Sequence, residues 1–199
     1  MWIKICGMTT PAAVAAAIDA GVDAIGFVFA KSVRQVTPEQ ATMLAAPARG
    51  RIRCVAVTRH PSQHDIDRIL QDFSPDVLQT DSADLCSLQL PRQLDLLPVL
   101  RSAQDGSDLP ARLLFEGLAS GTGMPCDWSA AQQVARRTEL VLAGGLNPNN
   151  VASAIAQVQP FGVDVSTGVE TRPGVKSPAH IVLFVTAARA PSVAHKDSL

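Results

Sequence analysis

Short apolar segments alternate with amphipathic segments along the whole chain. Eight of the apolar segments are bounded by glycine, proline or polar residues and have the length of a strand, which predicts a strand at each. The predicted strands are residues 2–6, 23–29, 52–57, 76–79, 96–100, 112–116, 139–143 and 161–165. Apolar residues at helical spacing, with capping residues before them, predict helices between the strands. These helices are expected at residues 12–20, 38–46, 62–73, 82–90, 127–137, 148–157 and 177–188.

Strands that alternate with helices indicate an α/β protein with a parallel sheet. Eight such units close into a (β/α)8 TIM barrel, and the 199 residues allow about 25 for each unit, at the low end for that fold. The fifth unit is the shortest, because residues 102–110 are too polar and turn-rich for more than one helical turn. We therefore expect a compact barrel with a reduced fifth helix. An open doubly wound sheet is the alternative.

The whole barrel is expected to form one domain over residues 1–189, followed by a polar, disordered tail at residues 190–199. Hydrophobic residues make up 47% of the chain, which is within the globular range, and no apolar run is long enough to span a bilayer. The chain begins directly with a strand pattern, so we expect no signal peptide. A formal net charge of -1 gives no reason to expect nucleic acid or an anionic membrane as a partner.

The cysteines and histidines argue against disulfides and metal. The four cysteines have no CxxC spacing, and the chain is not a small, cysteine-dense one. We therefore expect reduced thiols and a cytoplasmic protein. The four histidines form no ligand cluster in the sequence, and His60 and His64 are expected on a solvated surface. No metal site is predicted.

Cys6 is the first candidate for chemistry, because it ends the first predicted strand, just before Gly7. In both candidate folds, ligands bind at the carboxyl ends of the strands, so a thiol at this position would face them. A thiolate there could act as a base if its pKa were lowered. The alternative is a buried cysteine used as a small hydrophobic residue.

Glycine-bearing loops follow the seventh and eighth predicted strands, in residues 142–150 and 163–170. Glycine lets backbone amides approach an anion closely, and loops at these two places are the usual phosphate site of a β/α barrel. The alternative is that both are merely tight turns. The residues expected to bind phosphate are Gly144, Gly145, Ser166, Thr167 and Gly168.

Two charged residues are expected at the same rim. Glu116 ends the apolar sixth strand, before a loop with glycine and serine at residues 117–123. A carboxyl group held over an apolar layer would be desolvated, which would raise its pKa toward that of a general acid. Arg34 lies in the loop after the second strand, where its guanidinium group could bind a carboxylate. Either residue could instead be an ordinary solvated loop charge.

Taken together, these motifs resemble the phosphoribosylanthranilate isomerase family of tryptophan biosynthesis. The matching stretches run from end to end of the chain in the family's order. They are residues 4–9, residues 26–29 with Ser32 and Arg34 before Pro38 and Glu39, residues 120–123 ahead of Asp127 and Trp128, residues 143–148, and residues 163–170.

The resemblance implies an eight-stranded β/α barrel and an enzyme that needs no metal or cofactor. Its reaction would be the Amadori rearrangement of N-(5-phosphoribosyl)anthranilate to 1-(2-carboxyphenylamino)-1-deoxyribulose 5-phosphate. The family's general base is a cysteine on the first strand, which corresponds to Cys6, and its general acid corresponds to Glu116. Arg34 and Asp164 would bind the substrate. The partner would be a small phosphorylated molecule, with no nucleic acid or membrane, and the enzyme would be a monomer or a weak homodimer.

The chain departs from the family at three places. Glu116 stands where the family has an aspartate, and the loop after it is shorter. After the fourth strand, residues 78–81 replace a Gln-Leu-His-Gly motif. After the third strand, residues 57–60 replace Val-Phe-Val-Asn. These departures change the expected shape of the rim.

Two other functions remain open. Another phosphosugar barrel enzyme, of the indole-glycerol-phosphate synthase or thiamine-phosphate synthase type, would share the fold and the phosphate loops. Such an enzyme has no need for the cysteine of residues 4–9. A non-catalytic phosphate-binding barrel is the other possibility, and in it Glu116 would be dispensable.

Overall fold

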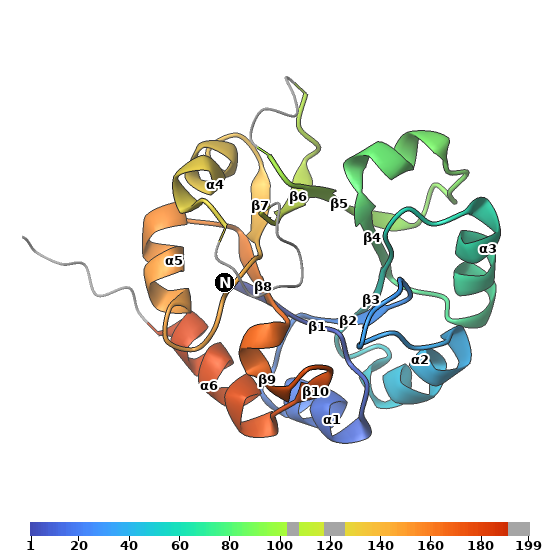
Figure 1. Ribbon diagram of the computed structural model, residues 1–199, viewed down its shortest axis with the longest axis horizontal. Helices are drawn as coiled ribbons and strands as arrows, with labels where there is room; N and C mark the ends of the chain where they lie inside the picture. The colour runs from blue at the N-terminus through green and yellow to red at the C-terminus, as the bar shows by residue number, and fades with distance from the viewer. Residues whose placement is uncertain (103–107, 118–125, 191–199) are drawn as a thin grey trace, which may run out of the picture.

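Eight parallel strands close into a barrel, in which each strand pairs with the next and β8 pairs with β1 (Figure 1). They are β1 (Trp2–Cys6), β2 (Ala24–Val28), β3 (Arg53–Val57), β4 (Val77–Asp81), β5 (Asp95–Leu100), β6 (Arg112–Phe115), β7 (Glu139–Leu142) and β8 (Gly162–Val165). The structure is a computed structural model that describes residues 1–102, 108–117 and 126–190. It confirms the predicted (β/α)8 barrel and excludes the open sheet.

Six α-helices of the described residues surround the barrel (Figure 1). They are α1 (Pro11–Asp19), α2 (Pro38–Ala45), α3 (Gln63–Asp72), α4 (Trp128–Ala135), α5 (Val151–Val158) and α6 (Pro178–Arg189). Five of these six begin where a side chain accepts a hydrogen bond from a backbone amide of the first turn, which is the local signal that starts a helix. The capping residues are Thr10, Thr37, Ser62, Asp127 and Ser177.

The short helix predicted at residues 82–90 begins where expected but is a 3-10 helix, η2 (Ser82–Ser87), and it ends three residues earlier. Polar side chains here bind other groups instead of favouring a longer helix: Asp84 accepts hydrogen bonds from Thr80 and His60, and the Ser87 hydroxyl donates to the Asp84 carbonyl. A second 3-10 helix, η1 (Ala46–Ala48), extends α2. The reduced fifth helix was expected within residues 102–110, of which residues 103–107 lie outside the described part of the chain.

An antiparallel hairpin that was not predicted follows the last barrel strand. The 3-10 helix η3 (Thr167–Val169) leads into β9 (Glu170–Arg172), which pairs with β10 (Val175–Lys176). The hairpin contacts the loop after β1, because the Thr9 hydroxyl donates to the carbonyl oxygen of Gly174 at 2.8 Å. Its residues therefore lie beside the carboxyl end of the first strand.

Alternate residues of each strand face the barrel interior and the surrounding helices. In β1, Ile3 and Ile5 belong to the helix-side core, so Lys4 and Cys6 face the interior. The apolar part of the interior is formed by Ala24, Val55, Val77, Leu97, Val99, Leu114, Val141 and Ala143. Among the described residues, no helix has the length and apolar character needed to cross a membrane. The predicted tail falls almost wholly outside the described residues, at 191–199.

Candidate active site

A buried ion pair lies directly beneath Cys6 inside the barrel. Lys4 is 0% exposed, and its Nζ donates to Oδ1 of Asp164 on β8 at 2.8 Å. Gly26 of β2 stands opposite Cys6 in the sheet register. A Cβ atom at Gly26 would lie 3.1 Å from Cys6 Sγ and 3.2 Å from Lys4 Nζ. The sulfur and the ammonium group therefore share the space that the missing side chain of Gly26 leaves open.

The surroundings of Cys6 influence its ionisation in opposite directions. Burial raises the pKa of the Cys6 thiol, the Lys4 ammonium opposes this rise, Asp164 adds to it and Lys176 opposes it. Burial alone would lower the pKa of Lys4, but Asp164 and Cys6 together raise it above its ordinary value. Burial outweighs the nearby ammonium group, so the pKa of the Cys6 thiol lies above its ordinary value, and Lys4 is the strongest of the groups that favour the thiolate.

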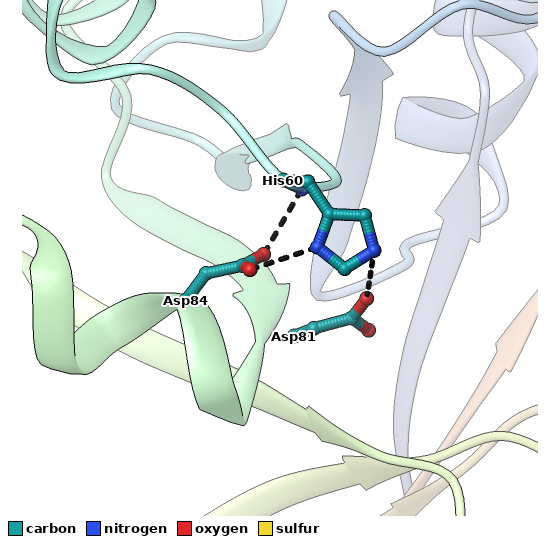
Figure 2. A group of neighbouring side chains, drawn as sticks. All are labelled: His60, Asp81 and Asp84. Carbon is teal, nitrogen blue, oxygen red and sulfur yellow. Dashed lines mark hydrogen bonds and ion pairs between the residues drawn. The ribbon is translucent and has the colours of Figure 1, made fainter.

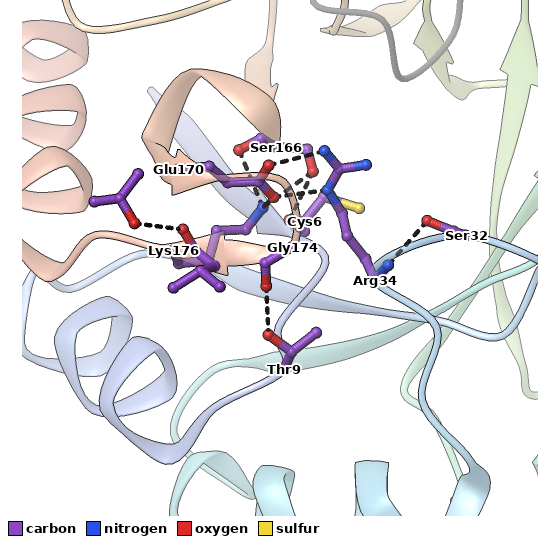
Figure 3. Close-up of polar contacts among 10 residues, drawn as sticks. Cys6, Thr9, Ser32, Arg34, Ser166, Glu170, Gly174 and Lys176 are labelled. Atoms are coloured by element: carbon purple, nitrogen blue, oxygen red, sulfur yellow. Dashed lines mark hydrogen bonds and ion pairs between the residues drawn. The ribbon is translucent and has the colours of Figure 1, made fainter.

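Arg34 is bound by Glu170, the first residue of β9 (Figure 3). The guanidinium group donates from Nε to Oε1 at 2.7 Å and from Nη2 to Oε2 at 2.9 Å. Lys176 donates to the same Oε1 at 2.6 Å, and to the Ser166 carbonyl and hydroxyl oxygens at 3.0 and 3.1 Å. Ser166 in turn donates from Oγ to the Cys6 carbonyl at 3.1 Å. These contacts connect the loop after β2, the loop after β8 and the end of β1.

This group of charges keeps Glu170 ionised. Burial opposes the charged form, but hydrogen bonds from Arg34 and Lys176 hold the pKa of the Glu170 carboxyl below its ordinary value. Burial lowers the pKa of Lys176, although Glu170 works against that shift. Sequence reasoning placed Glu170 only within a phosphate-loop motif and did not find Lys176. The sequence did offer a signal for Lys176, which is a lysine in the short, turn-rich segment that follows residues 163–170.

The two glycine-bearing loops lie against each other. Gly144 and Gly145 both have positive φ, 90° and 66°, a conformation that suits glycine. The Asn150 side chain donates to the Gly145 carbonyl at 2.9 Å and holds this loop in place. Across from it, a Cβ atom at Gly168 in η3 would collide with the carbonyl oxygen of Leu146. Glycine at position 168 therefore permits the close contact between the loops after β7 and β8.

Glu116 follows β6 and is paired with an arginine. Its Oε2 lies 3.3 Å from Nη1 of Arg101, which directly follows β5, and Arg101 also donates to Asp81 Oδ1 from Nε at 3.0 Å and from Nη2 at 2.7 Å. The Glu116 side chain is 19% exposed. The carboxyl group therefore has a neighbouring cation, from the residue after β5, in addition to the apolar interior that includes Leu114 of its own strand. Arg101 was missed in the sequence, although it stands at a strand end like the other candidates.

His60, in the segment after β3 that differs from the family, contacts Asp81 at the end of β4 and Asp84 in η2 (Figure 2). His60 Nδ1 lies 2.9 Å from Asp84 Oδ1, its backbone amide donates to Asp84 Oδ2 at 3.0 Å, and its Nε2 lies 3.7 Å from Asp81 Oδ2. The three side chains are close enough together to hold a cation. The sequence-based prediction missed this grouping, because it compared histidines only with one another.

The fold and this arrangement agree with a comparison to protein families. Residues 3–187 match the model of the family described as N-(5'-phosphoribosyl)anthranilate (PRA) isomerase. The chain belongs to the phosphoribosylanthranilate isomerase family. It is therefore an isomerase, as the resemblance of its motifs implied.

Individual relatives support this membership along the whole chain. The N-(5'-phosphoribosyl)anthranilate isomerase of Rhizobium etli is 39% identical over 205 residues, which cover 93% of this chain and 92% of the relative. The crystal structure of TrpF from Jonesia denitrificans superposes with a TM-score of 0.79 at 36% identity, covering 95% of this chain and 97% of that one. A phosphoribosylanthranilate isomerase in complex with reduced 1-(o-carboxyphenylamino)-1-deoxyribulose 5-phosphate has a TM-score of 0.78 at 28% identity, over 96% of this chain and 100% of that one.

The structure brings most of the sequence-predicted residues to one end of this isomerase barrel. Cys6 and Arg34 are connected to the loop after β8 through Ser166 and Glu170, and Asp164 lies beneath Cys6. Glu116 instead belongs to a separate group with Arg101 on the β5–β6 side. The family-like stretch at residues 120–123 lies outside the described residues.

Proposed function

We propose that this chain converts N-(5'-phosphoribosyl)anthranilate into 1-(2-carboxyphenylamino)-1-deoxyribulose 5-phosphate in tryptophan biosynthesis. The observation that carries the proposal is the link between Cys6, Ser166 and the Arg34–Glu170 pair, within a chain of this family. These contacts support the proposal because they join the candidate base to the candidate phosphate loop and to the candidate carboxylate-binding cation. The proposed substrate needs a base for its C2 proton, a binding site for its phosphate and a cation for its carboxylate.

In this proposal Glu116 is the general acid and Cys6 the general base. Glu116 donates a proton to the ring oxygen of the ribose as the bond between that oxygen and C1 breaks, which leaves an iminium group between C1 and the nitrogen. The Cys6 thiolate then removes the proton from C2, and the electron pair forms an enamine. Tautomerisation gives the ketone at C2, so C2 is oxidised and C1 reduced within one molecule, with no external oxidant.

Binding groups surround these two residues. Glu170 occupies the Nε and Nη2 side of Arg34, which leaves Nη1 to bind the anthranilate carboxylate. Lys4 occupies Oδ1 of Asp164, and Oδ2, which makes no hydrogen bond within the described residues, accepts a substrate hydroxyl. The phosphate binds between Gly144–Gly145 and Ser166–Gly168, remote from the chemistry, so that its binding energy orients the reacting end.

We expect Gly168→Ala to weaken phosphate binding about tenfold or more, which is the effect of losing a charge-assisted hydrogen bond. The added methyl group would push the loop after β8 away from Leu146 and open the anion site. Calorimetric titration with inorganic phosphate measures the change. Gly50→Ala is the matched control, because that glycine also has positive φ, 71°, but has nothing within 4 Å of the added atom. Equal phosphate affinity in the Gly168 variant and the wild type would contradict the assignment.

We expect Arg34→Met to raise KM about 10- to 100-fold, the range for removing a hydrogen-bonded charge partner, with a smaller change in kcat. Glu170 would keep Lys176 as its partner, so the fold should survive. Steady-state kinetics of the variant measure both constants, and Arg34→Lys, which keeps the charge but not the fork of donors, should lie between. An unchanged KM would show that another group binds the carboxylate.

The decisive test is a fluorescence assay in which freshly made phosphoribosylanthranilate is consumed by the purified chain. Turnover that is lost in Cys6→Ala would support the proposal. A chain that binds phosphate but does not turn over this substrate would be a non-catalytic barrel or another phosphosugar enzyme, and assays for indole-glycerol-phosphate and thiamine-phosphate synthesis would separate these. The cytoplasmic location and the monomer or weak homodimer stay predictions, the second to be tested by sedimentation.

A further inference from the structure

Lys4 is a charged residue in a barrel interior that is otherwise largely apolar. Its side chain is 0% exposed and its ammonium group is paired with Asp164 at 2.8 Å. Burying two charges costs several kcal/mol per ion before their attraction is counted, and well-packed apolar residues often serve stability as well. Stability is therefore a weak reason for this pair, whereas chemistry at the neighbouring Cys6 is a stronger one.

The geometry directs the ammonium group to the thiol. Lys4 and Cys6 are two residues apart on one strand, so both point into the barrel. Gly26 stands beside them, and a side chain there would meet Sγ at 3.1 Å and Nζ at 3.2 Å. A glycine inside a strand weakens the strand, and it often marks a place where other atoms need the space of a side chain. Here the space is occupied by the sulfur and the ammonium group.

We propose that Lys4 is a positioning residue for Cys6: its ammonium group stabilises the thiolate that removes the C2 proton, while Asp164 keeps that ammonium group in place. This inference rests on the proposed function, in which Cys6 is the base. The proton taken from C2 ends on Sγ, and the electron pair of the broken C2–H bond neutralises the iminium group as the enamine forms. Lys4 stays protonated throughout, because Asp164 remains its partner.

The other charges around Cys6 have a smaller net influence. Arg34 and Lys176 both approach it, but both are hydrogen-bonded to Glu170, which offsets their charge. Gly26 contributes no charge from the side of β2. Among the groups that act against burial on the pKa of Cys6, Lys4 has the largest effect and Lys176 a smaller one, whereas Asp164 acts in the same direction as burial. Removing Lys4 and removing Asp164 must therefore change the ionisation of Cys6 in opposite directions.

Titration of Cys6 by NMR, in protein labelled with 13C at the cysteine Cβ atoms, tests this. We expect Lys4→Met to raise the apparent pKa of Cys6 by about one or more, and Asp164→Asn to lower it. In Lys4→Met, a tenfold smaller thiolate fraction should lower kcat at neutral pH about tenfold, with the pH–rate profile displaced to higher pH and KM nearly unchanged. Lys31→Met, which removes an exposed loop lysine, is the matched control and should change neither quantity.

An unpaired Asp164 could prevent Lys4→Met from folding. The double variant Lys4→Met/Asp164→Asn buries no lone charge and should still raise the thiol pKa, because Lys4 has the larger effect of the two. If the pKa of Cys6 were unchanged in both Lys4→Met and the double variant, the inference would be overturned and the Lys4–Asp164 pair would be structural. A wild-type chain without isomerase activity would refute the proposed function, whereas opposite changes of the Cys6 pKa in the two single variants would still establish the coupling of Lys4 to Cys6.

Discussion

Replacing Cys6 with alanine is expected to abolish isomerisation and to leave the fold and substrate affinity largely intact. Cys6 is the candidate base at the end of β1, and losing a positioned general base costs about 10²–10⁴ in rate. The substitution removes one sulfur atom at the mouth of the barrel, where Cys6 retains 7% exposure, so the free energy of unfolding should fall by only about 1 kcal/mol. Turnover is measured by the fluorescence assay, and affinity by titration with a reduced product analogue.

Cys54→Ala is the matched control for this result. Cys54 is 0% exposed, belongs to the helix-side core and has a pKa raised by burial to about 11. The same truncation there should lower the melting temperature more than Cys6→Ala does, because it leaves a cavity in a closed core, yet it should preserve kcat. If Cys6→Ala kept wild-type turnover, Cys6 would be structural and the base would have to be sought elsewhere.

The barrel was predictable because its signals are local. Buried parallel strands give short apolar segments, and all eight were placed within a few residues of their observed bounds. Helix starts followed from Thr37 and Ser62, whose capping boxes are complete in the structure. The hairpin β9–β10 gave no such signal, because its strands are only three and two residues long and are held by a buried charge rather than by an apolar face.

The candidate site was predictable only in part, because its ion pairs join residues far apart in the chain. Lys4 and Asp164 meet across the seam where β8 closes on β1, a contact between residues 160 positions apart. Their partnership depends on the register of that seam, which no single segment encodes. Arg101 likewise reaches Glu116 from the neighbouring strand. Individual site residues could be found in the sequence because each lies at the end of a predicted strand. Their ion-pair partners could be found only once the closed barrel was known.

Replacing Glu116 with glutamine is expected to lower kcat about 10²–10⁴-fold, the usual cost of losing a positioned acid. Glutamine keeps the size of the side chain but has no acidic proton that it could transfer to the ring oxygen. Arg101 would keep its two hydrogen bonds to Asp81, so the rim should remain ordered. Glu116→Asp should retain part of the activity, limited by its shorter reach. Kinetics and melting temperatures of the purified variants measure these effects.

Asp127 is the alternative acid, and its surroundings argue for a structural role. It caps α4 by accepting hydrogen bonds from the amides of Ser129 at 2.9 Å and Ala130 at 3.2 Å. Asp127→Ala should therefore cost about 1 kcal/mol of stability, the usual effect of losing a helix cap, and leave kcat nearly unchanged. Because Glu116→Gln should do the reverse, the two variants separate catalysis from folding. A nearly wild-type Glu116→Gln beside a folded but inactive Asp127→Ala would mean that Asp127, not Glu116, is the acid.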